Sequence, residues 1–241
     1  MATNEDILKE VLALLEREKR FNLHQFPLTV SIANGILTVE GEVERVAAKK
    51  LALERAASVA GVDGVVDRLH VVPAEVMEDG AIRDHVSDML VEEPAFSEYT
   101  LRAMVKGSLV SVREISTGGG GVIEVDVTDG AVTLNGNVGS LSHKRLAGVL
   151  AWWVPGSRDV VNGLEVVPPM EDNDDEVTDA VRLVLEKDPF VNAGQIRVHS
   201  RNYVVTLEGV VPKAKEKDMA EDDAWCVFRV NDVVNRLVVA E

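Results

Sequence analysis

Cysteine is nearly absent from this chain of 241 residues, which contains only Cys226. A single thiol cannot close an internal disulfide bond, and it cannot supply the several sulfur ligands of a cysteine-based zinc site. The sequence therefore excludes both a disulfide framework and a cysteine zinc centre.

Aromatic residues and long apolar runs are also scarce. Phe, Trp and Tyr make up 4% of the chain against 46% for all hydrophobic residues, so the cores are expected to be aliphatic. No apolar run approaches the ~20 residues of a membrane-spanning helix. The first residues lack the basic segment and apolar run of a secretory signal. We therefore expect a cytoplasmic protein, or a periplasmic one if a leader has been removed.

Basic residues are also scarce relative to acidic ones. Lys and Arg total 25 against 41 Asp and Glu, which gives a net charge of -16. Such a chain is repelled by phosphate backbones and by anionic membrane surfaces. We expect no nucleic-acid partner, and the charge disfavours attachment to anionic lipid.

The chain contains a threefold internal repeat. A ten-residue block occurs at Asn34–Val43, Asp129–Val138 and Asn202–Val211. A shorter block follows each copy, at Val65–Leu69, Val160–Leu164 and Val233–Leu237. The distance from the glycine of the first block to the Asp or Asn of the second is 26 residues each time (41 to 67, 136 to 162, 209 to 235). Repetition at a constant spacing predicts three copies of one structural unit.

The residue pattern within a repeat predicts an α+β unit. In the first copy, helical spacing over residues 4–19 precedes a strand near 28–32, an Asn34-Gly35 hairpin turn and a strand at 36–43. A helix at 44–59 and a strand at 65–71 follow, and a right-handed crossover makes the last two strands parallel. We expect three tandem αββαβ modules, each a small three-stranded mixed sheet packed against two helices.

One glycine per repeat falls where the second strand gives way to the helix, and these glycines are expected to be structural: Gly41, Gly136 and Gly209. The predicted modules span residues 1–73, 78–168 and 177–241. An insertion around 102–121 lengthens the second module and ends in a glycine run that is expected to form a flexible loop. Residues 169–176 are expected to form a solvated acidic linker.

The blocks resemble those of the BON domain family (bacterial OsmY and nodulation). The resemblance rests on Val132-Thr133-Leu134-Asn135-Gly136-Asn137-Val138 and on Val161-Asn162-Gly163-Leu164, with close counterparts in the other two repeats. It implies small helix-strand-strand-helix-strand modules without catalytic activity. It further implies links to osmotic stress, to anionic phospholipid in cell envelopes and, in some potassium-binding members, to cation sensing.

No catalytic, metal or cofactor site is evident in the sequence. The glycine run at 118–121 is followed by Val122-Ile123-Glu124 instead of the Lys and Ser/Thr of a phosphate-binding loop. The five histidines share no metal-ligand spacing. We therefore expect no enzyme and no bound cofactor.

Two groups of residues are candidates for contact with a partner or a lipid. Trp152 and Trp153 end the second helix of the middle repeat, and Lys144 and Arg145 stand at its start. In the alternative interpretation, Trp153 fills the core and Trp152 packs under the insertion.

The second group is in the third repeat, where Arg197 and Arg201 fall on the polar side of a strand. Basic side chains on a strand are also typical of an ordinary solvated sheet face, and that alternative stays open.

The first functional hypothesis is a binding or scaffold protein of osmotic or envelope stress that contacts an unknown protein through its middle repeat. The second is a module that responds to a monovalent cation such as potassium. The third is peripheral attachment to anionic phospholipid.

Overall fold

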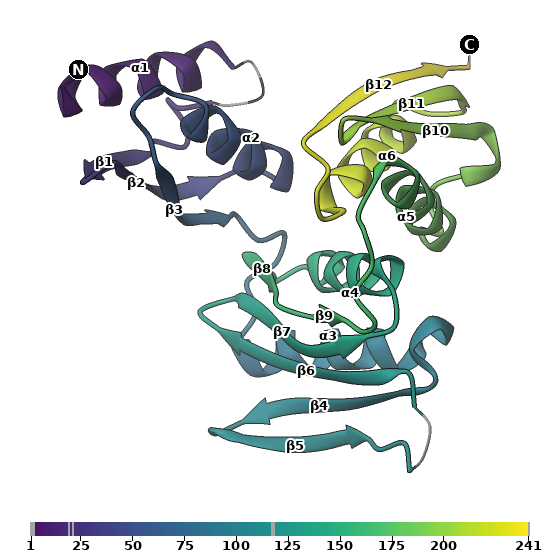
Figure 1. The fold of residues 1–241 in the computed structure, drawn as a ribbon. Coiled ribbons are helices and arrows are strands. Elements are labelled where there is room, and N and C mark those ends of the chain that lie inside the picture. The colour runs from purple at the N-terminus through teal and green to yellow at the C-terminus, as the bar shows by residue number, and fades with distance from the viewer. Residues whose placement is uncertain (1–2, 19, 21, 117–118, 241) are drawn as a thin grey trace. The chain divides into compact units, whose positions relative to one another are not determined.

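The computed structural model describes residues 3–18, 20, 22–116 and 119–240 (Figure 1). Predictions that fall on residues 1–2, 19, 117–118 and 241 lie outside the described residues. They concern the outer ends of the first and third modules, the last residue of the first helix and part of the glycine run. The chain divides into two compact units, Met1–Val72 and Pro73–Glu241.

The first unit holds one module, with the element order α1(Asn4–Arg17), β1(Thr29–Ala33), β2(Ile36–Val43), α2(Val46–Ala57), β3(Gly64–Val71). Strand β2 pairs antiparallel with β1 and parallel with β3. Helix α1 begins after a capping box, in which the Thr3 hydroxyl accepts the Asp6 N–H and the Asp6 carboxylate accepts the Thr3 N–H. The buried faces of α1 and α2 pack on one side of the sheet (Figure 1).

The second unit starts with the middle module. Its elements are α3(Asp79–Glu92), η1(Pro94–Phe96), β4(Tyr99–Val105), β5(Ser108–Arg113), β6(Gly121–Thr128), β7(Ala131–Val138), α4(Leu141–Trp153), β8(Asp159–Asn162) and β9(Glu165–Val166). The strand order is β5-β4-β6-β7-β8, and β9 also pairs with β7. Helix α3, strands β6 and β7, helix α4 and strand β8 form the expected αββαβ unit.

The same unit ends with the third module. It contains α5(Asp174–Lys187), η2(Ala193–Gln195), β10(Ile196–Arg201), β11(Val204–Val211), α6(Ala214–Cys226) and β12(Asp232–Val239). Strand β11 pairs antiparallel with β10 and parallel with β12, as in the first module. The α+β class with tandem αββαβ modules is confirmed.

The middle module carries an addition that the sequence analysis did not identify. Residues 99–113 form the hairpin β4–β5, and β4 runs parallel to β6. Because the third strand of the module is also split into β8 and β9, the sheet has six strands instead of three. The hairpin closes through Lys106 and Gly107, whose φ angles of 51° and 79° match a two-residue turn. The extra length is thus mostly ordered sheet, and Gly121 of the glycine run begins β6.

The predicted acidic linker of residues 169–176 is corrected at its end, because its last three residues belong to α5. Asn173 caps α5 by accepting the N–H groups of Asp175 and Glu176, and residues 174–176 form the first turn of the helix. Carboxylates are favoured there because the first turn has free N–H groups and the positive end of the helix dipole.

A carboxylate at the first residue of a helix holds the hairpin turn in both modules of the second unit. Asp174 accepts the N–H groups of Asn202 and Tyr203, each at 2.8 Å. Asp79 accepts those of Asp129 and Gly130 at 3.0 and 2.8 Å. Tyr203 thereby keeps a left-handed φ of 62° at a position where the first module has glycine.

The three glycines of the repeat all adopt positive φ angles, 144° at Gly41, 109° at Gly136 and 146° at Gly209. A Cβ atom on Gly136 would clash with the carbonyl oxygen of Val122 in β6, and one on Gly209 with that of Gln195, the residue just before β10. Glycine therefore permits a close approach of the neighbouring backbone within β2, β7 and β11.

Candidate binding surfaces

Helix α4 of the middle module packs against α5 and α6 of the third, and Arg145 lies in this contact. Its side chain is fully buried, with Nη2 2.5 Å from Asp172 Oδ1 and Nε donating to the Phe228 carbonyl at 3.2 Å. The prediction that Arg145 contacts an outside partner is therefore corrected. The Arg145 guanidinium can be buried because Asp172 of the acidic segment supplies a carboxylate that neutralises its charge.

Asp172 joins the two modules from the other side as well. Its second oxygen lies 3.6 Å from Arg229 Nε, and the Arg229 guanidinium stacks over the Tyr203 ring at 4.8 Å. The Lys144 ammonium lies 5.3 Å from the centre of the Phe228 ring, so this residue of α4 also faces the third module. Burial, followed by the charge of Arg145, lowers the pKa of Lys144.

The tryptophan pair ends α4 and is half-buried. Trp153 Nε1 donates a hydrogen bond to Asp223 Oδ1 of α6 at 2.9 Å, which is a third polar link between the modules. Lys144, Arg145 and Trp153 thus contact the chain's own third module. Trp152 retains partial exposure next to them.

Asp223 lies beside a second buried carboxyl group, that of Asp188, which caps the end of α5. The two side chains are within hydrogen-bonding reach of one another. Burial and the negative charge of Asp188 raise the pKa of Asp223 to about 8, against a partial lowering by the Trp153 N–H. Sequence reasoning missed this pair because acids near the end of a polar helix are usually solvated.

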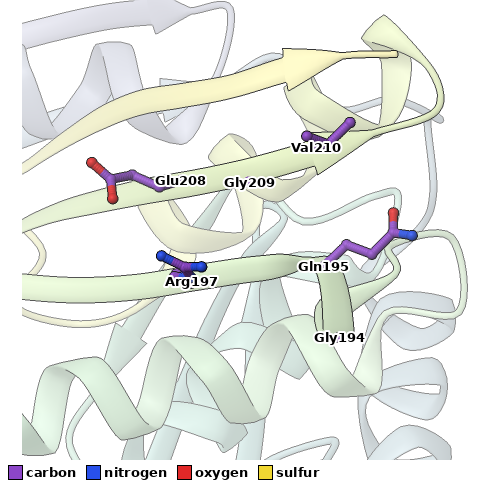
Figure 2. A pocket seen from close by; sticks show the side chains of 6 residues that line it. All are labelled: Gly194, Gln195, Arg197, Glu208, Gly209 and Val210. Atoms are coloured by element: carbon purple, nitrogen blue, oxygen red, sulfur yellow. The ribbon is translucent and has the colours of Figure 1, made fainter.

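Arg197 and Arg201 are exposed on β10, as a solvated sheet face would place them. Arg197 stands opposite Glu208 in the β10–β11 pairing and lines an open depression of about 490 Å³ (Figure 2). Gly194, Gln195, Gly209 and Val210 complete its lining. A guanidinium, a carboxylate and an amide can hydrogen-bond a polar group here.

Strand β5, an outer strand of the six-stranded sheet, exposes three large apolar side chains. Leu109, Val110 and Val112 are 44%, 48% and 42% exposed, so both faces of the strand are accessible. An edge strand also presents backbone N–H and C=O groups that no strand within the sheet pairs.

The hairpin that bears β5 is anchored to the body of the module. Arg113 donates to the backbone carbonyls of Tyr99, Val91 and Phe96. The Tyr99 hydroxyl contacts His143 Nδ1 at 2.8 Å and accepts the Gly139 N–H at 3.0 Å. Strand β5 is therefore presented on a fixed support.

The described residues contain no cluster of three or more His, Cys, Asp or Glu side chains arranged to hold a metal ion. In the same part of the chain, no helix combines the length and the apolar character needed to cross a membrane.

The family model described as "BON domain" matches the chain three times, at residues 3–73, 97–168 and 173–241. The chain belongs to the BON domain family. Helix α3 of the middle BON module lies before the second match, while the β4–β5 hairpin lies inside it. BON domains are non-catalytic binding modules.

No curated protein matches the chain. Among solved structures, the C-terminal domain of CdsD, "the structural protein of the Type III secretion system of Chlamydia trachomatis", is 15% identical. The alignment covers 100% of both chains with a TM-score of 0.26. A second CdsD structure is also 15% identical, over 98% of this chain and 92% of that one, with a TM-score of 0.25. Likeness at this level carries no argument about function.

Proposed function

We propose that this protein is a non-enzymatic scaffold of stress response, acting in the cytoplasm through a protein contact made by its middle BON module. The observation that supports the proposal is the exposed apolar edge strand β5, held on a hairpin that extends the middle sheet. The partner contributes an extended segment that adds to this edge as a further strand.

The register of the hairpin identifies the backbone groups that would pair. Val105 and Ser108 flank the two-residue turn and face one another, so they form the hydrogen-bonded pair next to it. Since hydrogen-bonded positions alternate, the N–H and C=O groups of Leu109 and Ser111 point away from β4. The register shifts by one residue beyond Ser111, which limits the pairing edge to the turn-proximal part of β5.

Charge favours an apolar segment with acidic flanks as the partner. Residues 99–113 contain Arg102, Lys106 and Arg113 but no acid, in a chain with 41 acidic residues. The charge of Arg102 is neutralised by Glu114 and Glu124. The guanidinium of Arg113 is bound to backbone carbonyls. Lys106 at the hairpin tip is therefore the basic group best placed to contact a partner. Strands β4 and β5 thus carry no acidic residue of their own that would repel an acidic segment at this edge.

The test is capture from extracts of the source cells with the full chain and with Val110→Lys. A lysine at this edge disfavours strand addition, which is how natural proteins protect such edges. The matched control is Val238→Lys, because Val238 is a 61% exposed valine on β12 of the same unit. The proposal predicts a protein retained by the wild type and by Val238→Lys but lost with Val110→Lys. Equal retention by all three chains would refute the β5 edge as the contact.

A further inference from the structure

Two aspartates of the third BON module are buried where this module meets the middle one. Asp188 is 8% exposed and Asp223 is 6% exposed. Trp153 of the middle module donates to Oδ1 of Asp223 at 2.9 Å, whereas Oδ2 of Asp223 is buried and accepts no hydrogen bond from the described residues. A buried carboxylate oxygen without a donor is costly, and a proton on it removes the cost.

Acidic residues surround Asp223 on both helices of its own module. Asp188 lies at the end of α5, and Asp222 adds a second negative charge from α6. Lys187 precedes Asp188, but its ammonium is bound to Glu93 of the middle module at 2.7 Å. Glu216 of α6 is also buried, and it accepts the Asn192 N–H. Asp223 itself lies in the last turn of α6 and Asp188 at the end of α5, so both carboxyl groups face the negative end of a helix dipole.

We infer that the Asp188–Asp223 pair, together with Trp153, is a proton-binding site that makes the docking of the third module on the middle module dependent on pH. With one shared proton, Asp223 donates to Asp188 and keeps its Oδ1 for the Trp153 N–H. Loss of that proton leaves Asp223 ionised in the buried contact, with Oδ2 lacking a donor and Asp188 beside it, and separation of α6 from α4 lets water solvate this charge.

The sign of the effect follows from the raised pKa of Asp223, about 8 against an ordinary 3.8. Between these values the folded chain holds a proton that the unfolded chain has released. The contribution of Asp223 to the free energy of unfolding is at its maximum below about pH 4 and is lost progressively as pH rises toward 8. Neutral to mildly alkaline pH is therefore the range in which the contact weakens.

The experiment follows urea unfolding of the full chain by tryptophan fluorescence between pH 6 and 9. All three tryptophans, Trp152, Trp153 and Trp225, lie in the second unit, so the signal reports that unit alone. One proton taken up on folding changes the unfolding equilibrium constant about tenfold per pH unit. Asp223→Asn keeps an oxygen for Trp153 and gains a fixed donor for Asp188, so it is expected to remove this component of the pH dependence.

Asp188→Asn serves as a second variant, since it removes the repulsion from the other side. Asp179→Asn on α5 is the control, because its side chain is 70% exposed. Acrylamide quenching of tryptophan fluorescence in the folded chain reports whether the two modules loosen, because Trp153 lies in their contact. The inference requires a flattened unfolding profile and pH-independent quenching in Asp223→Asn, and wild-type behaviour in Asp179→Asn. It is overturned if wild type and Asp223→Asn share one pH profile, or if quenching does not rise with pH in the wild type.

Discussion

Arg145 and Asp172 form an ion pair of 2.5 Å between Nη2 and Oδ1, in which the guanidinium is fully buried and the carboxylate is 12% exposed. Arg145 belongs to α4 of the middle module, and Asp172 to the segment that leads into the third. The pair therefore fixes the acidic segment against both modules, with Arg229 as a second cation for the same carboxylate.

Asp172→Ala is expected to destabilise the second unit by about 3–5 kcal/mol, because it leaves the Arg145 charge buried without its partner. The measurement is urea unfolding followed by tryptophan fluorescence. Glu171→Ala changes the exposed neighbouring residue and is expected to stay within about 0.5 kcal/mol. Adding Arg145→Met to Asp172→Ala should recover part of the loss. A double variant no more stable than Asp172→Ala would show that the buried charge is not the cause.

Asp174→Asn tests the carboxylate that holds the Asn202-Tyr203 turn. Hydrogen bonds from the Tyr203 N–H, the Ser200 hydroxyl and the Asn202 N–H lower the pKa of Asp174 below its ordinary 3.8. The stability it contributes is full above the unfolded-state value and is lost as pH falls below about 4. At pH 7 the variant should lose about 1 kcal/mol. Denaturant unfolding at pH 7 and pH 3 checks this, and an equal difference at both pH values would contradict it.

Gly209→Ala is expected to cost about 1–3 kcal/mol, since φ is 146° and the new Cβ meets the Gln195 carbonyl oxygen. Gly107→Ala is the matched control: its φ is 79°, and a Cβ there meets nothing within 4 Å. The control therefore carries backbone strain without a clash. Thermal unfolding of the two variants separates these effects. Equal losses would show that the close strand approach at Gly209 contributes nothing.

Much of this fold can be predicted from the sequence, because each repeat contains short-range patterns that specify its turns and strands. Asn34-Gly35 and Asp129-Gly130 predict hairpin turns, and the alternation of apolar residues fixes the strands around them. The β4–β5 hairpin could also be predicted from the sequence, since Lys106-Gly107 separates two segments that contain β-branched residues. It was missed because the neighbouring glycine run suggested a loop.

The inter-module contacts could not be predicted in the same way. Arg145 and Asp172 are 27 residues apart, and Trp153 and Asp223 are 70 apart. No periodicity links such positions, because they meet only when two separately folding modules dock. The segment that contains Asp172 looked like a solvated spacer for the same reason: its role depends on a cation from another element.

The scaffold proposal also predicts how the protein responds to ions. Melting temperatures in potassium, sodium and calcium salts at equal ionic strength should agree, because strand addition at the β5 edge involves no ion. A ligand that binds only the folded state stabilises it by RT ln(1 + L/Kd), where L is the free ligand concentration. A rise in melting temperature specific to potassium would contradict the scaffold account and support the cation-responsive alternative.

The central claim is that a partner adds a strand to β5, and backbone amide exchange tests it most directly. Hydrogen exchange is measured at single-residue resolution in the free chain and in complex with the protein that Val110→Lys fails to capture. The account predicts that the outward-facing amides of Leu109 and Ser111 become protected on binding, while those of β10 and β12 do not change. Unchanged exchange at Leu109 and Ser111 in the bound state would contradict it.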